Sequence, residues 1–218
     1  MPSLRQLLAE HPSLLLIDSS SARVQVGLWT QGETIPPLWR SSDTEASVGI
    51  FNCVESLLTE AKLRIADLSV FVFCEGPGSV LGIRTAAVAL RSWLVINPRA
   101  PAYTYQSLDL VAHALNRPGL NVIADARRDS WHVAQVGAPL QRVPSAALTG
   151  ELVMPEHFRH WTPLPAGLTR TGYDLAALLG SLADADLFRA VTEPDAFMHE
   201  DPSYVTWTPQ IHQAPRPA

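Results

Sequence analysis

The chain is poor in the features that mark several common classes of protein. Its 218 residues include only two cysteines, Cys53 and Cys74, which form no Cys-x-x-Cys motif. A disulfide framework or a thiolate metal site is therefore not expected. No apolar run approaches the ~18 residues of a membrane span, and residues 1–12 lack the apolar core of a signal peptide. We expect a cytoplasmic protein with no membrane partner.

Positive charge is also scarce. Lys and Arg total 16 against 21 Asp and Glu, which gives a formal net charge of -5. No window gathers the basic residues that a groove following a nucleic-acid backbone would use. The hydrophobic share of 47% is nevertheless ample for a globular core in one or two domains.

The first hundred residues contain a regular series of patterns. Short apolar or alternating stretches predict three strands at 14–17, 24–28 and around Leu38, which we expect to form an antiparallel meander. A capping-box motif at 42–45 and apolar residues at helical spacing predict a helix over 44–62. A buried strand over 69–74 and a helix that ends near Ile96 should follow, because Asn97-Pro98 stops that helix.

The rest of the chain gives a weaker α and β pattern. Five prolines between residues 137 and 170 argue against long elements there, and three more prolines from Thr208 onward predict a disordered tail. The elements expected in this half are a helix over 107–115, strands over 120–124 and 131–136, and a helix over 173–188.

The segment Asp18-Ser19-Ser20-Ser21 follows the first strand and opens a hairpin. Actin, Hsp70 and the sugar kinases keep a phosphate-binding Asp-x-Gly-Thr loop at this place. Ser20 replaces the glycine, and a side chain there hinders the approach of a phosphate to the backbone amides. Asp18 and Ser19 are weak candidates for binding a cofactor phosphate. The alternative is a simple hairpin turn in which Asp18 accepts hydrogen bonds from local amides.

A glycine-rich loop joins the fourth predicted strand to its helix, with Gly76 and Gly78 around Pro77. A helix N-terminus after such a loop can hold an anion, so these two glycines are further weak candidates for binding a cofactor. The same glycines could equally serve a tight connection between strand and helix.

Three motifs occur in an order and spacing that resemble the bacterial TsaB (YeaZ) family. They are Leu-Leu-Leu-Ile-Asp-Ser-Ser at 14–20, Gly-Pro-Gly-Ser-Val-Leu-Gly-Ile-Arg at 76–84 and Ala-Asp-Ala-Arg-Arg at 124–128. The resemblance implies an α/β fold of the two-lobed actin-like and Hsp70-like (ASKHA) kind, each lobe a mixed sheet with flanking helices. We expect the first lobe over 1–100, a more divergent second lobe over 101–207, and the tail over 208–218.

The resemblance also implies a function. The chain would be a non-catalytic partner of the TsaD threonylcarbamoyl transferase, which modifies ANN-decoding tRNAs to threonylcarbamoyladenosine. A TsaE-like ATPase is the other expected partner, and contact with tRNA would be indirect. We expect no catalytic residue, no cofactor and no metal of its own, and a homodimer through its helix pair when the transferase is absent.

Two enzymatic alternatives of the same fold remain. An ATP-dependent phosphotransferase would need the phosphate loop, whose glycine is missing. A metallopeptidase of the glycoprotease type would need two histidines on the first long helix, but the chain has no histidine between His11 and His113. His157 and His160 have the spacing of one helical turn, yet they lie between prolines, where a solvated loop is expected rather than a metal site.

The helix expected after the glycine loop has a face without charge, which we interpret as a partner-binding surface. The only charged residues from Val80 to Ile96 are Arg84 and Arg91. An uncharged face of small and apolar residues allows the close approach of another helix. The alternative is that the two lobes of the chain bury this face. The residues assigned to the surface are Thr85, Ala89, Ser92 and Ile96, with Cys53 and Leu57 from the preceding helix.

A charged turn, Asp125-Ala-Arg-Arg-Asp129, separates the two strands expected in the second half. It could contact a partner or tRNA. Alternating charges between two strands are more often a solvated turn.

Overall fold

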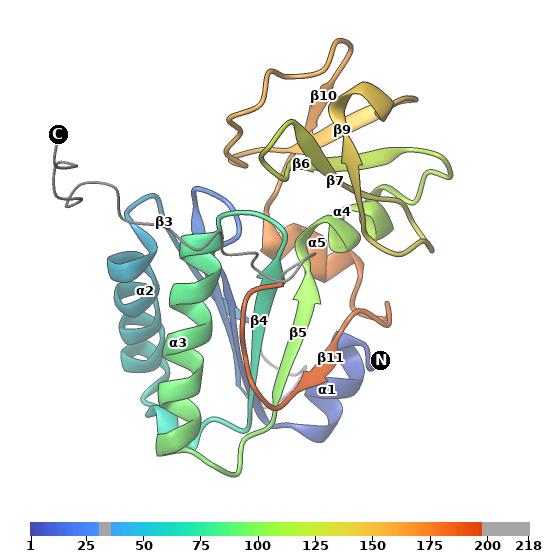
Figure 1. Ribbon diagram of the computed structural model, residues 1–218. Coiled ribbons are helices and arrows are strands. Elements are labelled where there is room, and N and C mark those ends of the chain that lie inside the picture. The colour runs from blue at the N-terminus through green and yellow to red at the C-terminus, as the bar shows by residue number, and fades with distance from the viewer. Residues whose placement is uncertain (31–35, 198–218) are drawn as a thin grey trace, which may run out of the picture.

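The computed structural model describes residues 1–30 and 36–197 of the chain. Those residues form two mixed sheets with helices around them, one sheet above the other in Figure 1. The elements are α1 (Leu4–Glu10), β1 (Ser13–Asp18), β2 (Val24–Thr30), β3 (Leu38–Ser42), α2 (Ala46–Ala61), β4 (Val70–Gly76), α3 (Val80–Ile96), β5 (Ala102–Gln106), α4 (Ser107–Leu115), β6 (Asn121–Asp125), β7 (Ser130–Ala134), β8 (Gln141–Pro144), β9 (Leu152–Pro155), β10 (Thr169–Thr171), α5 (Leu175–Ser181) and β11 (Arg189–Val191), with two short 3-10 turns at Ile65–Asp67 and Ser145–Ala147.

The first sheet has the strand order β11-β5-β4-β1-β2-β3. The predicted meander of β1, β2 and β3 is confirmed, and β4 pairs in parallel with both β1 and β5. The run Leu14–Ile17 is continuously apolar because both faces of this sheet are covered. Leu14 and Leu16 pack toward α1, whereas Leu15 and Ile17 pack toward α2 and α3, in the alternation that a strand imposes.

The two long helices α2 and α3 lie side by side on one face of the first sheet (Figure 1). The first was predicted from helical spacing and the second from the glycine-rich loop before it and the Asn97-Pro98 stop after it, and the predicted ends agree with the structure to within two residues. The predicted capping box at the start of α2 is wrong. Glu45 is the N-cap residue without a side-chain hydrogen bond, and Ser42 Oγ instead accepts from the N–H of Thr44 at 3.2 Å.

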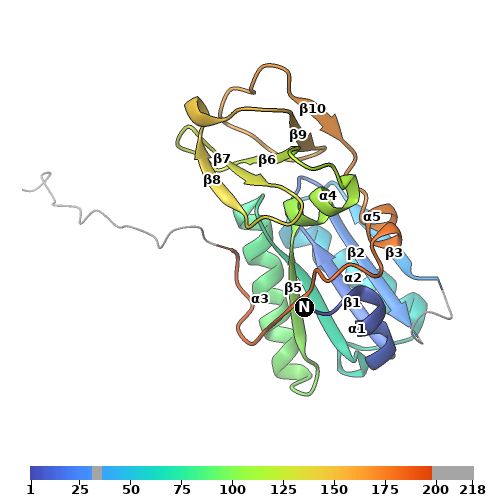
Figure 2. The ribbon, with the colours of Figure 1, turned by 90° about the vertical axis from the view of Figure 1, so that its right-hand side faces the viewer.

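The second sheet has the strand order β10-β9-β6-β7-β8, with β6 and β7 as an antiparallel hairpin. The helix α4 connects the sheets and lies between them in Figure 2. One hydrophobic cluster continues from Leu14 and Val72 of the first sheet, through Leu108 of α4, to Val122 and Trp131 of the second. The two lobes therefore share a core and are packed directly against each other.

The structure differs from the sequence prediction in where the chain changes lobes. β5 and β11 fall within residues 101–207, yet both pair into the first sheet. The first sheet thus takes strands from both expected lobes. The last helix, expected over 173–188, covers only Leu175–Ser181, and α1 was not predicted. The expected tail at 208–218 lies outside the described residues.

Within residues 1–30 and 36–197, no helix combines the length and hydrophobicity needed to cross a bilayer.

Candidate functional site

The β1–β2 turn and the glycine-rich loop before α3 are in direct contact. The N–H of Ser79 donates to the carbonyl of Ser20 at 2.6 Å. A Cβ atom on Gly78 would lie 2.2 Å from that carbonyl oxygen, and one on Gly82 would lie 2.4 Å from the carbonyl oxygen of Ser19. Only glycine permits these approaches. Gly78 and Gly82 therefore serve the close packing of the β1–β2 turn on the loop, a structural role different from the strand-to-helix connection that was the alternative prediction.

Asp18 is fully buried at the end of β1 and accepts four hydrogen bonds. Its Oδ1 accepts from the N–H of Ser20 at 2.8 Å and from the Ser20 hydroxyl at 2.7 Å. Its Oδ2 accepts from the hydroxyls of Tyr105 at 2.6 Å and Tyr173 at 2.7 Å. The carboxylate is therefore saturated by donors from within the chain.

The two tyrosines keep their protons in this environment. Burial raises the pKa of both Tyr105 and Tyr173 well above its ordinary value, and the charge of Asp18 raises it further. Both hydroxyls are thus fixed as donors. Tyr105 comes from β5 and Tyr173 from the segment before α5, so the network joins three distant parts of the chain. Asp18 could be identified from the sequence, because it follows an apolar strand, whereas neither tyrosine lies in a recognisable local motif.

The arrangement around Asp18 is closed to a ligand. The carboxylate has no exposed surface, and its donors occupy the positions that a phosphate-bound metal or a water would need. Of the four weak cofactor candidates, Asp18, Gly76 and Gly78 serve internal packing and hydrogen bonding. Ser19 differs, because its buried hydroxyl has no hydrogen-bond partner.

The predicted partner-binding face divides into two groups in the structure. Ala89, Cys53 and Leu57 are buried in the core between α2, α3 and the first sheet, and their assignment to an outer surface needs correction. A small side chain on one helix lets the neighbouring helix approach closely, which here happens inside the chain. Thr85 is half-buried, and Ser92 and Ile96 are exposed.

The outer face of α2 and α3 carries most of the exposed apolar side chains. Seven of the ten exposed large hydrophobic residues found in the described part of the chain lie on these two helices: Val48, Phe51, Val80, Leu81, Val88, Val95 and Ile96. Leu81 and Val95 keep 79% and 81% of their surface exposed. A concentration of this kind on one face marks an interaction surface more often than a solvated one.

The polar residues within this face are turned back onto the helix. The Thr85 hydroxyl donates to the carbonyl of Leu81 at 2.8 Å, and the Ser92 hydroxyl donates to the carbonyl of Val88 at 3.0 Å. Their donor groups are thereby satisfied without water. Residues 81, 85, 88, 92 and 95 follow the alternating spacing of four and three that forms one stripe along a helix. We call Leu81, Thr85, Val88, Ser92 and Val95 the α3 stripe.

The charged turn between β6 and β7 is organised by Asp125. Its carboxylate accepts from the N–H groups of Arg127 at 2.5 Å, Trp161 at 2.6 Å and Thr162 at 2.7 Å. Burial raises the pKa of this carboxyl, but these backbone donors lower it more, so the net pKa lies below its usual range. Arg127 also lies 4.1 Å above the ring of Trp161. The turn is therefore tied to the 156–163 loop rather than freely solvated.

The two cysteines and the two histidines of the 156–163 loop are the remaining candidates for metal or redox chemistry. Cys53 and Cys74 are both buried and unpaired, and burial raises the pKa of each thiol. His157 and His160 lie in the loop after β9, outside any helix, so they do not share a helical face. Within the described ranges, no three His, Cys, Asp or Glu side chains come together as a metal-ligand set.

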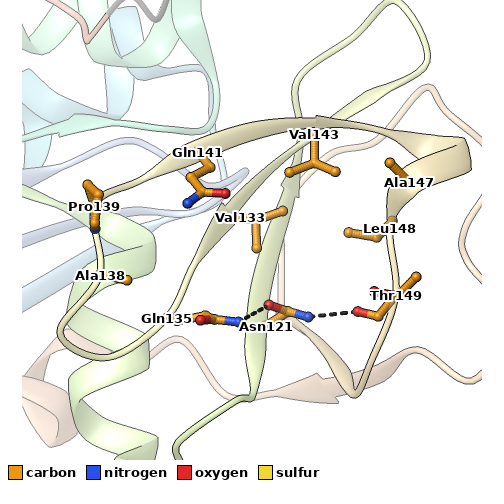
Figure 3. A pocket seen from close by; sticks show the side chains of 10 residues that line it. All are labelled: Asn121, Val133, Gln135, Ala138, Pro139, Gln141, Val143, Ala147, Leu148 and Thr149. Atoms are coloured by element: carbon orange, nitrogen blue, oxygen red, sulfur yellow. Dashed lines mark hydrogen bonds between the residues drawn. The ribbon is translucent and has the colours of Figure 1, made fainter.

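The second sheet has a concave pocket of about 190 Å³ beside β7 and β8, shown in Figure 3. Its lining residues are uncharged. The amide of Gln135 donates to Asn121 Oδ1 at 2.7 Å, and Asn121 Nδ2 donates to the carbonyl of Thr149 at 2.8 Å. These amides hold the β8–β9 segment against the sheet. The pocket offers no acid, base or thiol for catalysis.

Comparisons with known proteins find a family similarity over part of the chain and a shared fold. Residues 41–147 match the sequence model of the TsaD family, described as tRNA N6-adenosine threonylcarbamoyltransferase. No curated protein matches the sequence of the chain.

Two solved structures share the fold. YeaZ from Pseudomonas aeruginosa is 18% identical, with 78% of this chain and 90% of that chain covered at a TM-score of 0.58. A second structure, of an uncharacterized protein with similarity to peptidase YEAZ from Pseudomonas aeruginosa, is 18% identical, with 78% and 89% covered at a TM-score of 0.56. Residues 41–147 are thus similar to the TsaD family, and the chain has the two-lobed actin-like fold of YeaZ that the resemblance found in the sequence implied.

Proposed function

We infer that the chain takes part in the threonylcarbamoyladenosine modification of tRNA, as a non-catalytic protein that docks a TsaD-like threonylcarbamoyl transferase. The relation to YeaZ and the match to the TsaD family support the process. The docking role rests on the outer face of α2 and α3, where seven of the ten exposed large hydrophobic residues of the described chain are gathered.

This face has the chemistry of a protein contact rather than of a substrate site. The α3 stripe presents Leu81, Val88 and Val95 to solvent, while its hydroxyls bond to the helix itself. Phe51 of α2 lies edge-on to Trp93 of α3, with ring centroids 6.2 Å apart, so the apolar surface continues across both helices. Burying it against another apolar helix face would contribute roughly 25 cal/mol for each Å² removed from water.

The occupant we propose is the transferase, because the family model that matches this chain describes that enzyme. When the transferase is absent, a second copy of the chain would use the same face. A TsaE-like ATPase would bind the assembled pair. Contact of this chain with tRNA would be indirect, since its net charge is -5 and Lys and Arg carry most phosphate contacts.

The closed arrangement at Asp18 disfavours the phosphotransferase alternative. A phosphotransferase of this fold needs a carboxylate that can reach a phosphate-bound metal, and Asp18 already accepts four internal hydrogen bonds. The β1–β2 turn and the Gly78 loop also pack directly on each other. No observation on the described residues favours an enzymatic function.

The test is to place charge on the α3 stripe. We expect the double variant Val88→Glu, Val95→Glu to fold normally, because both side chains are exposed. It should bind the transferase of the same host at least about tenfold more weakly, since a central apolar contact is lost and two charges must be desolvated. Binding is measured by calorimetry, and the size of the complex by light scattering.

The matched control is Leu164→Glu, an equivalent change at an exposed position of the second lobe. The control should bind as the wild type does. Unchanged binding by the double variant would contradict the proposed docking face.

A further inference from the structure

The α3 stripe lies near the place where the described chain ends. Figures 1 and 2 show the segment after β11 running beside α3. Ala196 is buried there, in the hydrophobic cluster between the first sheet and its two long helices. The N–H of Phe197 then donates to the carbonyl of Glu75 at 2.7 Å, at the end of β4 and just before the loop that leads into α3. Residues 198–218 therefore begin beside the N-terminal end of the stripe.

Residues 198–207 combine apolar side chains with negative charge. Their sequence is Met-His-Glu-Asp-Pro-Ser-Tyr-Val-Thr-Trp, without Lys or Arg. The charged residues of α3 are Arg84 and Arg91, and both are exposed. Tyr204 and Trp207 belong to the residue types that contribute most to contacts between protein surfaces. The segment therefore complements the outer face of α3 both in hydrophobicity and in the sign of its charge.

This segment is long enough to cover the stripe. From Leu81 to Val95 the helix rises by about 21 Å, at roughly 1.5 Å per residue. The ten residues 198–207 span about 33 Å when extended, so Trp207 can reach every position along the stripe. A short tether also holds a segment at an effective concentration on the order of mM. A second copy of the chain at micromolar concentration would compete poorly with such a segment.

We propose that residues 198–207 fold back over the α3 stripe and shield its apolar side chains from water, with Trp207 as the main apolar contact. The self-contact needs no partner. Its consequence rests on the docking function proposed above: a transferase that binds the stripe must first displace the segment. The segment therefore lowers the affinity of the stripe for the transferase, because only the uncovered fraction of the chain can bind.

The test joins the segment to the stripe by a disulfide in the full-length chain. One variant combines Thr206→Cys with Ser92→Cys on the stripe. The matched control combines Thr206→Cys with Ser181→Cys, an exposed serine at the end of α5. The native thiols of Cys53 and Cys74 are buried and should not compete. After copper-catalysed air oxidation of the dilute protein, mass spectrometry should find at least about a fivefold higher yield of the intramolecular disulfide in the Ser92 variant than in the control.

Two outcomes of the oxidation would overturn the proposal. Equal yields of the intramolecular disulfide in both variants would mean that the segment reaches α3 and α5 without preference. A disulfide that forms mainly between two copies of the Ser92 variant would mean that a second copy, and not the segment of the same chain, occupies the stripe. Neither outcome involves the transferase, so this test is independent of the proposed function.

Trp207→Ser tests the effect of the segment on the partner. Loss of the ring should uncover the stripe and lower the Kd for the transferase several-fold, measured by calorimetry. Ile211→Ser, an apolar-to-polar change beyond the segment, should leave the Kd unchanged. A wild-type Kd in the Trp207 variant would overturn the proposed shielding. If the transferase binds neither the wild type nor the variants, the docking function fails, and the disulfide yields alone decide whether the self-contact exists.

Discussion

Replacing Tyr173 by Phe tests whether the Asp18 network holds the two lobes together. The substitution removes a single hydroxyl that donates to Asp18 Oδ2 at 2.7 Å and lies 3.3 Å from the Ser20 hydroxyl. The ring stays, together with its edge-on packing against Phe158 at a centroid distance of 5.0 Å. Any loss of stability therefore reports the hydrogen bonds and not a cavity.

The expected loss follows from the charge and burial of the acceptor. A hydrogen bond to a charged group contributes about 1.5–3 kcal/mol, and Asp18 is completely buried, so water cannot replace the missing donor. Tyr105 then remains as the one side-chain donor to Oδ2. We expect Tyr173→Phe to lower the free energy of unfolding by about 2 kcal/mol. For a chain of this size, each kcal/mol of lost stability lowers Tm by roughly 2–4 °C.

The assay is urea unfolding followed by circular dichroism, with Tyr103→Phe as the control. Tyr103 is half-buried on β5, and its hydroxyl makes no hydrogen bond to the described residues. The control should change the free energy of unfolding by less than about 0.5 kcal/mol. If the two variants unfold at the same urea concentration, Asp18 does not depend on Tyr173 and the reasoning fails.

Two further substitutions test the interior of each lobe. Ala89→Glu should unfold or precipitate the chain, because Ala89 is on the buried face of α3 and an unpaired buried charge costs several kcal/mol; a soluble variant with the wild-type Tm would contradict this burial. Asp125→Asn should destabilise the chain at pH 7 by about 1.5–3 kcal/mol, since the carboxylate accepts from the N–H groups of Trp161 and Thr162. Folding lowers the pKa of Asp125. The stability that its carboxylate contributes is therefore fully present above the unfolded-state pKa of about 4 and is lost as the pH falls through the folded-state pKa. The free energy of unfolding, measured in urea at pH 7 and pH 3, should therefore fall less on acidification in the variant than in the wild type. An equal fall in both would show that the Asp125 carboxylate does not stabilise the fold.

The order of strands and helices in the first lobe could be predicted because it follows from local patterns. Alternation in 24–28, the unbroken apolar run in 70–74 and the helical spacing after residue 46 each depend only on neighbouring residues and on which faces are covered. The place of β11 in the first sheet could not be predicted, since its three residues, Arg189–Val191, are too few for a pattern and depend on pairing with β5.

The candidate sites were likewise predicted where a local pattern exists and missed where distant residues decide. Asp18 was found from its position after a strand, but its partners Tyr105 and Tyr173 lie 87 and 155 residues away, beyond any local motif. Ala89 was misplaced because a small apolar residue on a helix suits an internal contact and an external one equally well. Only the packing of α2 against α3 decides which contact forms.

We propose that the α3 stripe serves threonylcarbamoyladenosine formation through a protein contact. The most direct measurement is nucleoside analysis of tRNA from host cells depleted of this chain and supplied with either the wild type or the Val88→Glu, Val95→Glu variant, at equal protein levels. We expect the wild type to restore threonylcarbamoyladenosine and the folded variant to leave it low. Full restoration by the variant would show that the α3 stripe is not needed, and an unchanged level after depletion alone would show that the chain itself is not needed.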